Sequence, residues 1–119
     1  FVVSEKNNTV IFIGDNHSFD NSGDYISIYD FETREFIFEN ILGPGYNGFG
    51  WNIELLDDDK TIIVSSDGKF KFFDTELGQF VREFGVQNGE WTLTNDRKRA
   101  IICNEGGIYE YDLGSGNII

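Results

Sequence analysis

Residues 61–74 read Thr-Ile-Ile-Val-Ser-Ser-Asp-Gly-Lys-Phe-Lys-Phe-Phe-Asp, and this stretch decides the fold class. Its first run, residues 61–65, is rich in β-branched side chains, which favour strands. A second β-rich run, residues 69–74, follows after a short polar turn. The Asp67-Gly68 step between two such runs is the strongest short-range signal of a β-hairpin. The stretch therefore predicts two antiparallel strands joined by a tight turn.

The end of this hairpin recurs along the chain. An aromatic residue precedes an aspartate about every forty residues, a spacing typical of repeat proteins. Polar and turn-forming residues follow each aspartate, and an apolar pair stands at the sixth and seventh positions after it, which predicts strand, turn and strand. The aspartates are Asp30, Asp74 and Asp112, and the apolar pairs are Phe36-Ile37, Phe80-Val81 and Ile118-Ile119.

The same hairpin is predicted in the other two units, from residues 9–13 and 25–30 and from residues 99–103 and 108–112. A further short β-rich or alternating segment precedes each hairpin: residues 1–4, 51–55 and 91–93. No segment has the periodicity and caps of a helix. We therefore expect an all-β chain of three four-stranded antiparallel blades of a β-propeller, at roughly 1–39, 49–84 and 89–119.

Residues 65–74 are similar to the second hairpin of a WD40 repeat, with Phe73 in the place of the tryptophan. The Trp-Asp ending of that family appears here as Tyr-Asp, Phe-Asp and Tyr-Asp. This chain departs from the pattern in having no Gly-His pair before the first strand of a unit. Glu110 also stands where the family has a buried aliphatic residue. Residues 72–85 are similar to an NHL-type propeller repeat as well, so the choice between the two families stays open.

The number of units bears on how complete the propeller is. Propellers typically close with about 4–8 blades, and an arc of three leaves two apolar blade faces open. We therefore expect a partial segment of a larger propeller, whose open faces are covered by further blades or by another chain. The sequence opens on Phe1 rather than Met, so we expect the true N-terminus to lie upstream. A small sandwich that stands alone is the alternative.

Composition excludes several classes of protein. Among 119 residues, 21 Asp and Glu against 9 Lys and Arg give a net charge of −12, which repels phosphate backbones and argues against nucleic-acid binding. The hydrophobic share of 39% is too high for a disordered acidic tail. A single cysteine excludes an internal disulfide framework, and no apolar run is long enough to span a membrane. We expect a cytoplasmic protein without a membrane partner.

Four groups of residues are candidates for chemistry, and the pattern around each favours a structural role. His17 lies in an Asp- and Asn-rich stretch, residues 15–24, whose oxygens suit Ca²⁺ but whose spacing is not that of an EF-hand. Residues 57–59, three aspartates, are expected to form a turn. Residues 97–99, the only basic cluster, are either solvated surface or a dock for an acidic partner. Cys103 is expected to be a small hydrophobe of a core strand. The sequence thus predicts no catalytic residue, no metal and no cofactor.

The connections between units hold the residues expected to meet a partner, because propellers present these loops together on one rim. Exposed side chains beside glycine suit recognition, since glycine lets a partner backbone approach closely. The predicted partner-binding residues are Tyr46, Asn47, Phe49, Gln87 and Asn88. By contrast, Trp51 and Trp91 stand at equivalent places in successive units, which indicates packing between blades.

The resemblance to WD40 repeats, together with the lack of a catalytic constellation, implies a non-enzymatic protein–protein interaction scaffold within a larger protein or complex. Its acidic surface favours basic partners. The alternative is a segment of an enzymatic propeller, lactonase-like or quinoprotein-like, with its active site in blades outside this sequence. An NHL-like RNA binder is a third option, and the net charge argues against it.

Overall fold

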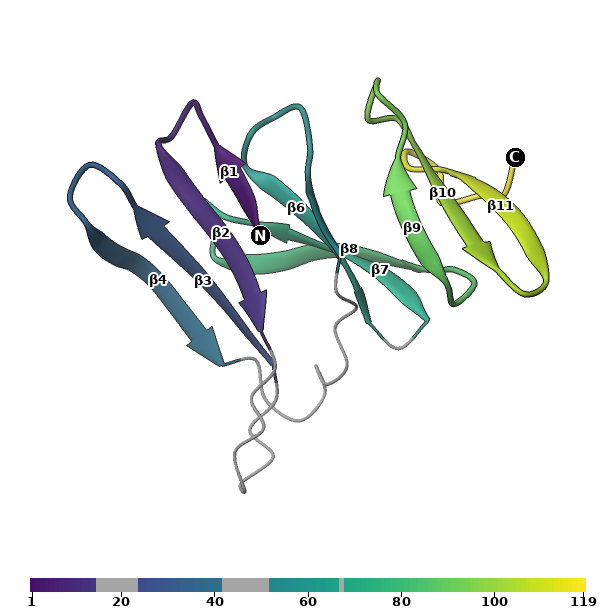
Figure 1. Ribbon diagram of the computed structural model, residues 1–119, viewed down its shortest axis with the longest axis horizontal. Coiled ribbons are helices and arrows are strands. Elements are labelled where there is room, and N and C mark those ends of the chain that lie inside the picture. Colours follow the sequence, from purple (N-terminus) through teal and green to yellow (C-terminus); the bar gives the residue numbers. More distant parts are fainter. Residues whose placement is uncertain (15–23, 42–51, 67) are drawn as a thin grey trace.

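The computed structural model describes residues 1–14, 24–41, 52–66 and 68–119, and these residues form strands and turns without a helix (Figure 1). Three antiparallel sheets lie in a row, each with its strands in chain order. The first contains β1 (Val2–Ser4), β2 (Thr9–Gly14), β3 (Tyr25–Asp30) and β4 (Glu35–Ile41). The second contains β5 (Ile53–Leu55), β6 (Thr61–Ser66), β7 (Lys69–Asp74) and β8 (Gln79–Gly85). The third contains β9 (Glu90–Leu93), β10 (Arg99–Asn104) and β11 (Gly107–Asp112). The predicted all-β class and up-and-down order are confirmed.

The third sheet differs from the prediction of four strands in every unit. It has three strands, and its fourth is represented by one isolated bridge between Tyr111 and Ile118. The N–H of Ile119 also donates to the carbonyl of Glu110 at 2.9 Å. Ile118 and Ile119 therefore lie along the edge of β11, but a single bridge is too short to count as a strand.

One turn geometry follows the third strand of all three sheets. The carbonyl of an aspartate accepts a hydrogen bond from the N–H four residues later, and that later residue has a positive φ. The side-chain Oδ1 of the same aspartate accepts amides of the turn, an arrangement that short polar side chains favour. The pairs are Asp30 with Arg34 (2.8 Å, φ 60°), Asp74 with Gly78 (2.8 Å, φ 69°) and Asp112 with Gly116 (2.7 Å, φ 75°).

Side chains alternate along each strand, so each sheet has two faces. We call the face that meets the preceding sheet the upstream face and the opposite one the downstream face. The downstream face of the first sheet packs its Ile11, Ile26 and Ile28 against the upstream Ile62, Val64 and Phe73 of the second. The downstream face of the second packs its Ile63, Phe70 and Phe72 against the upstream Trp91, Ala100 and Ile102 of the third. Both interfaces therefore have the same head-to-tail arrangement.

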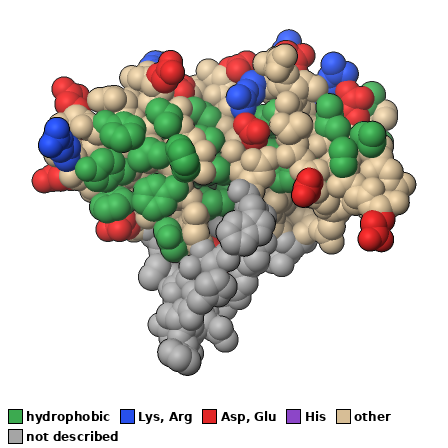
Figure 2. Space-filling view, viewed as in Figure 1, with side chains coloured by type: hydrophobic (Ala, Val, Ile, Leu, Met, Phe, Trp, Pro, Cys, Tyr) green, Lys and Arg blue, Asp and Glu red, His purple; other side chains and the backbone are tan. Residues whose placement is uncertain are grey.

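The upstream face of the first sheet carries an aromatic surface that no described residue of another sheet covers. The strand register makes Val10 and Tyr29 the equivalents of Ile62 and Phe73, which are fully buried in the second sheet. Tyr29 packs edge-to-face on Phe36, with 5.2 Å between ring centroids, and Phe36 is half exposed. Figure 2 shows apolar side chains gathered over this part of the molecule.

The downstream face of the third sheet is mixed in character. Glu110 pairs with Ile101 across the ladder and forms an ion pair with Arg99. A carboxylate is tolerated at this position, where WD40 repeats have a buried aliphatic residue, because no described sheet covers the face.

Candidate functional site

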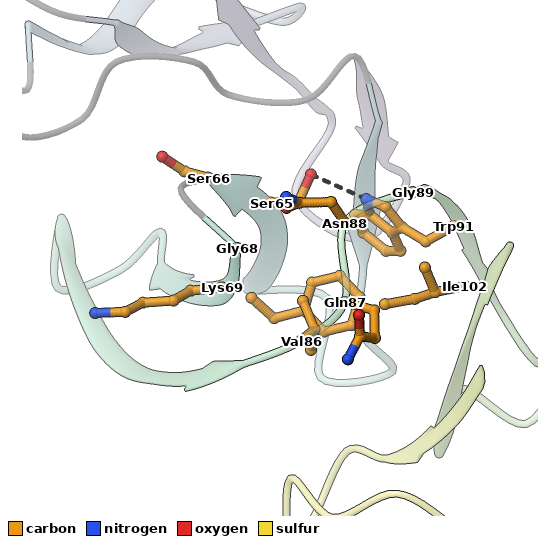
Figure 3. A pocket seen from close by; sticks show the side chains of 11 residues that line it. Ser65, Ser66, Gly68, Lys69, Val86, Gln87, Asn88, Gly89, Trp91 and Ile102 are labelled. Atoms are coloured by element: carbon orange, nitrogen blue, oxygen red, sulfur yellow. Dashed lines mark hydrogen bonds between the residues drawn. The ribbon is translucent and has the colours of Figure 1, made fainter. Parts of the chain in front are cut away.

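A pocket of about 190 Å³ lies where the second and third sheets meet (Figure 3). It is bounded by the turn between β6 and β7 and by the connection from β8 to β9. Its floor is apolar and buried, and its rim is polar. The floor consists of Phe70, Trp91 and Ile102; the rim consists of Ser65, Ser66, Lys69, Gln87 and Asn88; Gly68, Val86 and Gly89 complete the wall.

The main chain of residues 86–88 is fixed at three points. The N–H of Val86 donates to the carbonyl of Gly68 at 2.9 Å. The N–H of Gln87 donates to the hydroxyl of Tyr111 at 3.0 Å, and the carbonyl of Asn88 accepts the side-chain amide of Asn104 at 2.7 Å. The side chains of Gln87 and Asn88 remain exposed. A rigid backbone that presents exposed amides loses little conformational entropy when a partner binds.

Trp91 joins the two sheets at the floor. Its indole Nε1–H donates to Oγ of Ser65 at 3.1 Å, and its ring centroid lies 4.7 Å from that of Phe70. The residue is 8% exposed, so it packs between blades as predicted rather than acting as a surface anchor. Trp51, the equivalent residue of the preceding unit, lies outside the described residues.

Gly89 sets how closely the connection approaches β10. A Cβ at this position would lie 2.4 Å from the carbonyl oxygen of Cys103 and 2.9 Å from the side chain of Ile102. Its φ of 159° is also one that other residues rarely adopt. Only glycine permits this contact, which holds the rim at Gln87 and Asn88 against the third sheet.

The pocket has mixed polarity and one cation. Lys69 Nζ lies 3.1 Å from Oε1 of Glu83, and both side chains are about half exposed, so water screens the pair. Serine hydroxyls and carboxamides both donate and accept hydrogen bonds, which suits the polar groups of a peptide. An apolar floor within a polar rim is the arrangement found at protein–protein contact sites. The volume fits one side chain of a partner rather than a drug-sized ligand.

The structure divides the predicted partner-binding residues. Gln87 and Asn88 lie together on the pocket rim, whereas Tyr46, Asn47 and Phe49 lie outside the described residues. The sequence does not predict that Ser65, Ser66 and Lys69 line the pocket. It predicts the hairpin turn beside them, but no pattern in the sequence shows which connection packs against that turn.

The structure corrects the expectation for Cys103. The sequence predicts a small hydrophobe of a core strand, but Cys103 is exposed on the downstream face of the third sheet. Its neighbour Ile102 points to the upstream face and fills the core. Because side chains alternate, Cys103 must point the other way, toward a face that no described sheet covers.

The acidic run at residues 57–59 forms a turn, as predicted. Both oxygens of Asp58 accept hydrogen bonds from Thr61, at 2.8 Å from its N–H and 2.6 Å from its hydroxyl. Partial burial opposes ionisation of Asp58, but these bonds and the nearby Lys60 outweigh it and lower its pKa. Asp59 accepts the hydroxyl of Ser4 at 2.6 Å and so ties the second sheet to the first.

The basic run at residues 97–99 does not form an anion site. Arg97 pairs with Glu54 at 2.7 Å and donates to the carbonyl of Leu55 at 3.0 Å, which links the third sheet to the second. Arg99 pairs with Glu110. Two of the three cations thus serve contacts within and between sheets.

Other candidate sites are tested only in part. His17 lies outside the described residues. Within residues 1–14, 24–41, 52–66 and 68–119, no three His, Cys, Asp or Glu side chains are placed to hold a metal ion. Over the same ranges, no helix is long and apolar enough to cross a membrane.

Comparison with known proteins supports the fold. No protein-family model matches the chain. Over 100 residues, 76% of this chain, it is 25% identical to a WD40 protein of Homo sapiens, the U3 small nucleolar RNA-associated protein 4 homolog. The chain spans 15% of that protein's length.

Two solved structures of propeller type are similar to this chain over all or most of its length. Dihydro-heme d1 dehydrogenase NirN, solved in complex with DHE, matches with a TM-score of 0.67 at 17% identity. A functionally unknown protein from Desulfotomaculum acetoxidans DSM 771 matches with a TM-score of 0.61 at 19% identity. The matches cover 100% and 90% of this chain but 24% and 34% of those chains. The chain is therefore built of β-propeller repeats and spans about a third or less of the length of each of these three proteins.

Proposed function

We propose that the chain is part of a non-enzymatic scaffold that binds other proteins through the rim formed by its blade connections. The observation that carries this proposal is the rim at Gln87 and Asn88, where exposed carboxamides stand on a fixed backbone above an apolar floor. The similarity to a WD40 protein supports a propeller scaffold. The likeness to a dehydrogenase at 17% identity concerns the fold alone.

The experiment places a photo-crosslinking amino acid at Gln87 and, as a matched control, at Gln79, an exposed glutamine at the start of β8. A partner trapped from Gln87 but not from Gln79 is then purified and titrated against the wild-type chain and the variant Gln87→Ala/Asn88→Ala. We expect binding to weaken about 10-fold, a typical loss for two polar contacts. Equal trapping at both positions, or unchanged affinity of the variant, would contradict the proposal.

The proposed partners are basic. At a net charge of −12, association with a cationic surface is accelerated by long-range attraction, which salt screens. Raising ionic strength from about 0.05 to 0.5 M shortens the screening length several-fold, so the association rate should fall. A rate independent of salt would remove the electrostatic part of the proposal.

Direct binding to nucleic acid and a membrane partner are not part of the proposal, and we place the protein in the cytoplasm. The human relative's name associates that protein with a small nucleolar RNA, so RNA is the natural control ligand. The acidic surface should repel its phosphates. We expect no change in the fluorescence anisotropy of a labelled single-stranded RNA at micromolar protein, and saturable binding would exclude this reading.

We further propose that additional blades, in a larger propeller or from another chain, cover the two outer faces, and that the units run roughly over 1–39, 49–84 and 89–119. Support comes from Val10 and Tyr29, the equivalents of two fully buried residues of the second sheet. Head-to-tail interfaces of one kind close into a ring when the rotation per unit allows it. Aspartate substitution of Tyr29 should then disrupt assembly while leaving the described core intact.

A further inference from the structure

The connection from β8 to β9 contains an asparagine that is followed directly by a glycine, Asn88-Gly89. Asparagine is chemically labile, because the main-chain nitrogen of the next residue can attack its carboxamide carbon. Glycine at that next position leaves the nitrogen open to this reaction, since it has no Cβ. The other Asn-Gly step, Asn47-Gly48, lies outside the described residues. Among the described asparagines, only Asn88 precedes a glycine.

Both reacting groups are accessible. Asn88 and Gly89 are exposed and line the pocket between the second and third sheets (Figure 3). Within the described ranges, the Asn88 carboxamide forms no hydrogen bond, and the N–H of Gly89 donates none. Neither group has to leave a hydrogen-bond partner among these residues before the two react.

The fold opposes the reaction through the main chain. A succinimide ring imposes on its asparagine a ψ outside the regions that L-residues ordinarily occupy, so ring closure requires rotation about the Cα–C bond. At Asn88 this rotation also turns the carbonyl, which accepts a 2.7 Å hydrogen bond from Nδ2 of Asn104. The Asn104 side chain is oriented in turn by the N–H of Gly106, which donates to its Oδ1 at 2.7 Å. Asn104 therefore resists the rotation on which ring closure depends.

We propose that Asn88 is a site of spontaneous deamidation and that the Asn104 side chain governs its rate. The Gly89 nitrogen gives up its proton and bonds to Cγ of Asn88, and the side-chain NH₂ leaves with that proton as ammonia. Water then adds to one of the two carbonyls of the succinimide ring and opens it. The product is aspartate or isoaspartate, in which the main chain runs through Cγ.

Either product changes the rim of the pocket. Both add a negative charge next to Gln87, on the surface that the proposed function assigns to partners. Isoaspartate also lengthens the main chain by one carbon atom beside Gly89, where a Cβ would already lie 2.4 Å from the carbonyl oxygen of Cys103. The chain thus alters this surface with age and without an enzyme. The modification does not depend on the scaffold function, and its test needs no partner.

The test follows deamidation of the folded chain by mass spectrometry during incubation at neutral pH. Trypsin cleaves after Arg82 and Arg97 and releases residues 83–97, which contain Asn88 and, as an internal comparison, Asn95. A capped synthetic peptide of residues 83–97 measures the rate without the fold. We expect modification at Asn88 and none at Asn95. The rate at Asn88 should be about 10-fold or more below that of the peptide, because the connection must first open locally.

Two variants test the role of Asn104. Asn104→Asp keeps the acceptor for the Gly106 N–H but lacks the amide that holds the Asn88 carbonyl. Asn117→Asp makes the same change of charge at an exposed asparagine beyond β11. We expect Asn104→Asp to deamidate at Asn88 about 3- to 10-fold faster than wild type, the factor that one lost hydrogen bond allows. Asn117→Asp should match wild type.

Three results would overturn the inference: no modification at Asn88 in either the wild type or Asn104→Asp, a rate in the folded wild type equal to that of the peptide, or equal rates in Asn104→Asp and Asn117→Asp. The comparison with the peptide uses the wild type alone, so it remains decisive if Asn104→Asp does not fold. None of these results bears on which partner is crosslinked at Gln87, so failure here is distinguishable from failure of the scaffold proposal.

Discussion

The indole N–H of Trp91 and the hydroxyl of Ser65 form a 3.1 Å hydrogen bond across the boundary between the second and third sheets. Trp91 is 8% exposed, so its N–H has little access to water, and Ser65 supplies the acceptor. The same contact closes the floor of the pocket whose rim carries Gln87 and Asn88. Packing between blades and the shape of the candidate binding site therefore depend on one pair of side chains.

Removing either partner should destabilise the chain. Ser65→Ala leaves the indole N–H without this acceptor, which costs about 1–2 kcal/mol. Trp91→Phe removes the donor while keeping an aromatic ring against Phe70 and should cost a similar amount. Urea unfolding of both single variants and the double variant measures the coupling, expected at about 0.5–1 kcal/mol for directly bonded groups. Additive effects would show that the bond contributes nothing of its own.

Gly89→Ala should disturb the connection to the third sheet. The added methyl would lie 2.4 Å from a backbone oxygen, so the connection or β10 must shift. We expect a loss of about 2–3 kcal/mol in the free energy of unfolding. Gly85→Ala is the matched control, because a Cβ there meets nothing within 4 Å. Comparable losses for both variants would contradict the close-approach explanation.

The turn after β3 in the first sheet can be made more stable by a glycine. Arg34 has a φ of 60°, where Gly78 and Gly116 stand in the other two sheets. A residue with a Cβ is strained by about 1 kcal/mol in the left-handed backbone conformation. Arg34→Gly should therefore raise the free energy of unfolding by up to that amount. The reverse experiment, Gly78→Ala, adds the same strain and places a Cβ 3.1 Å from Phe38, so it should destabilise. Thermal unfolding measures both, and opposite signs are the expected outcome.

Acid should weaken the turns. Thr94's hydroxyl lowers the pKa of Asp96, and the N–H of Ser115 lowers the pKa of Asp112, as Thr61 and Lys60 do for Asp58. A carboxyl whose pKa is lower in the folded state stabilises above its ordinary value of 3.8 and loses this contribution as the pH falls through the folded pKa.

The stability difference between wild type and Asp58→Asn should therefore be largest near neutral pH and shrink below about pH 4. Asp57→Asn, in the same turn, is the control, since Asp58 accepts the Thr61 hydrogen bonds. Urea unfolding at several pH values measures the difference. A difference that stays constant from pH 7 to pH 2 would show that ionisation of Asp58 does not contribute.

Most residues of the pocket could not be predicted from the sequence. Gln87 and Asn88 are predicted to bind a partner because they lie in a connection between units and adjoin glycine, and the structure places them on the pocket rim. Their neighbours Ser65 and Lys69 were not predicted, because they are about twenty residues away in the chain and only packing of two sheets brings them near. Cys103 was misjudged for the same reason, since a strand pattern shows alternation but not which face is covered.

The amino-acid sequence by itself determined the hairpins, the aspartate turns and their threefold repetition, because these depend on hydrogen bonds and side-chain alternation among residues a few positions apart. Only the tertiary structure decided which face of each sheet meets its neighbour and which residues form a pocket. Those outcomes depend on contacts between sheets, where the burial of apolar side chains outweighs any local preference.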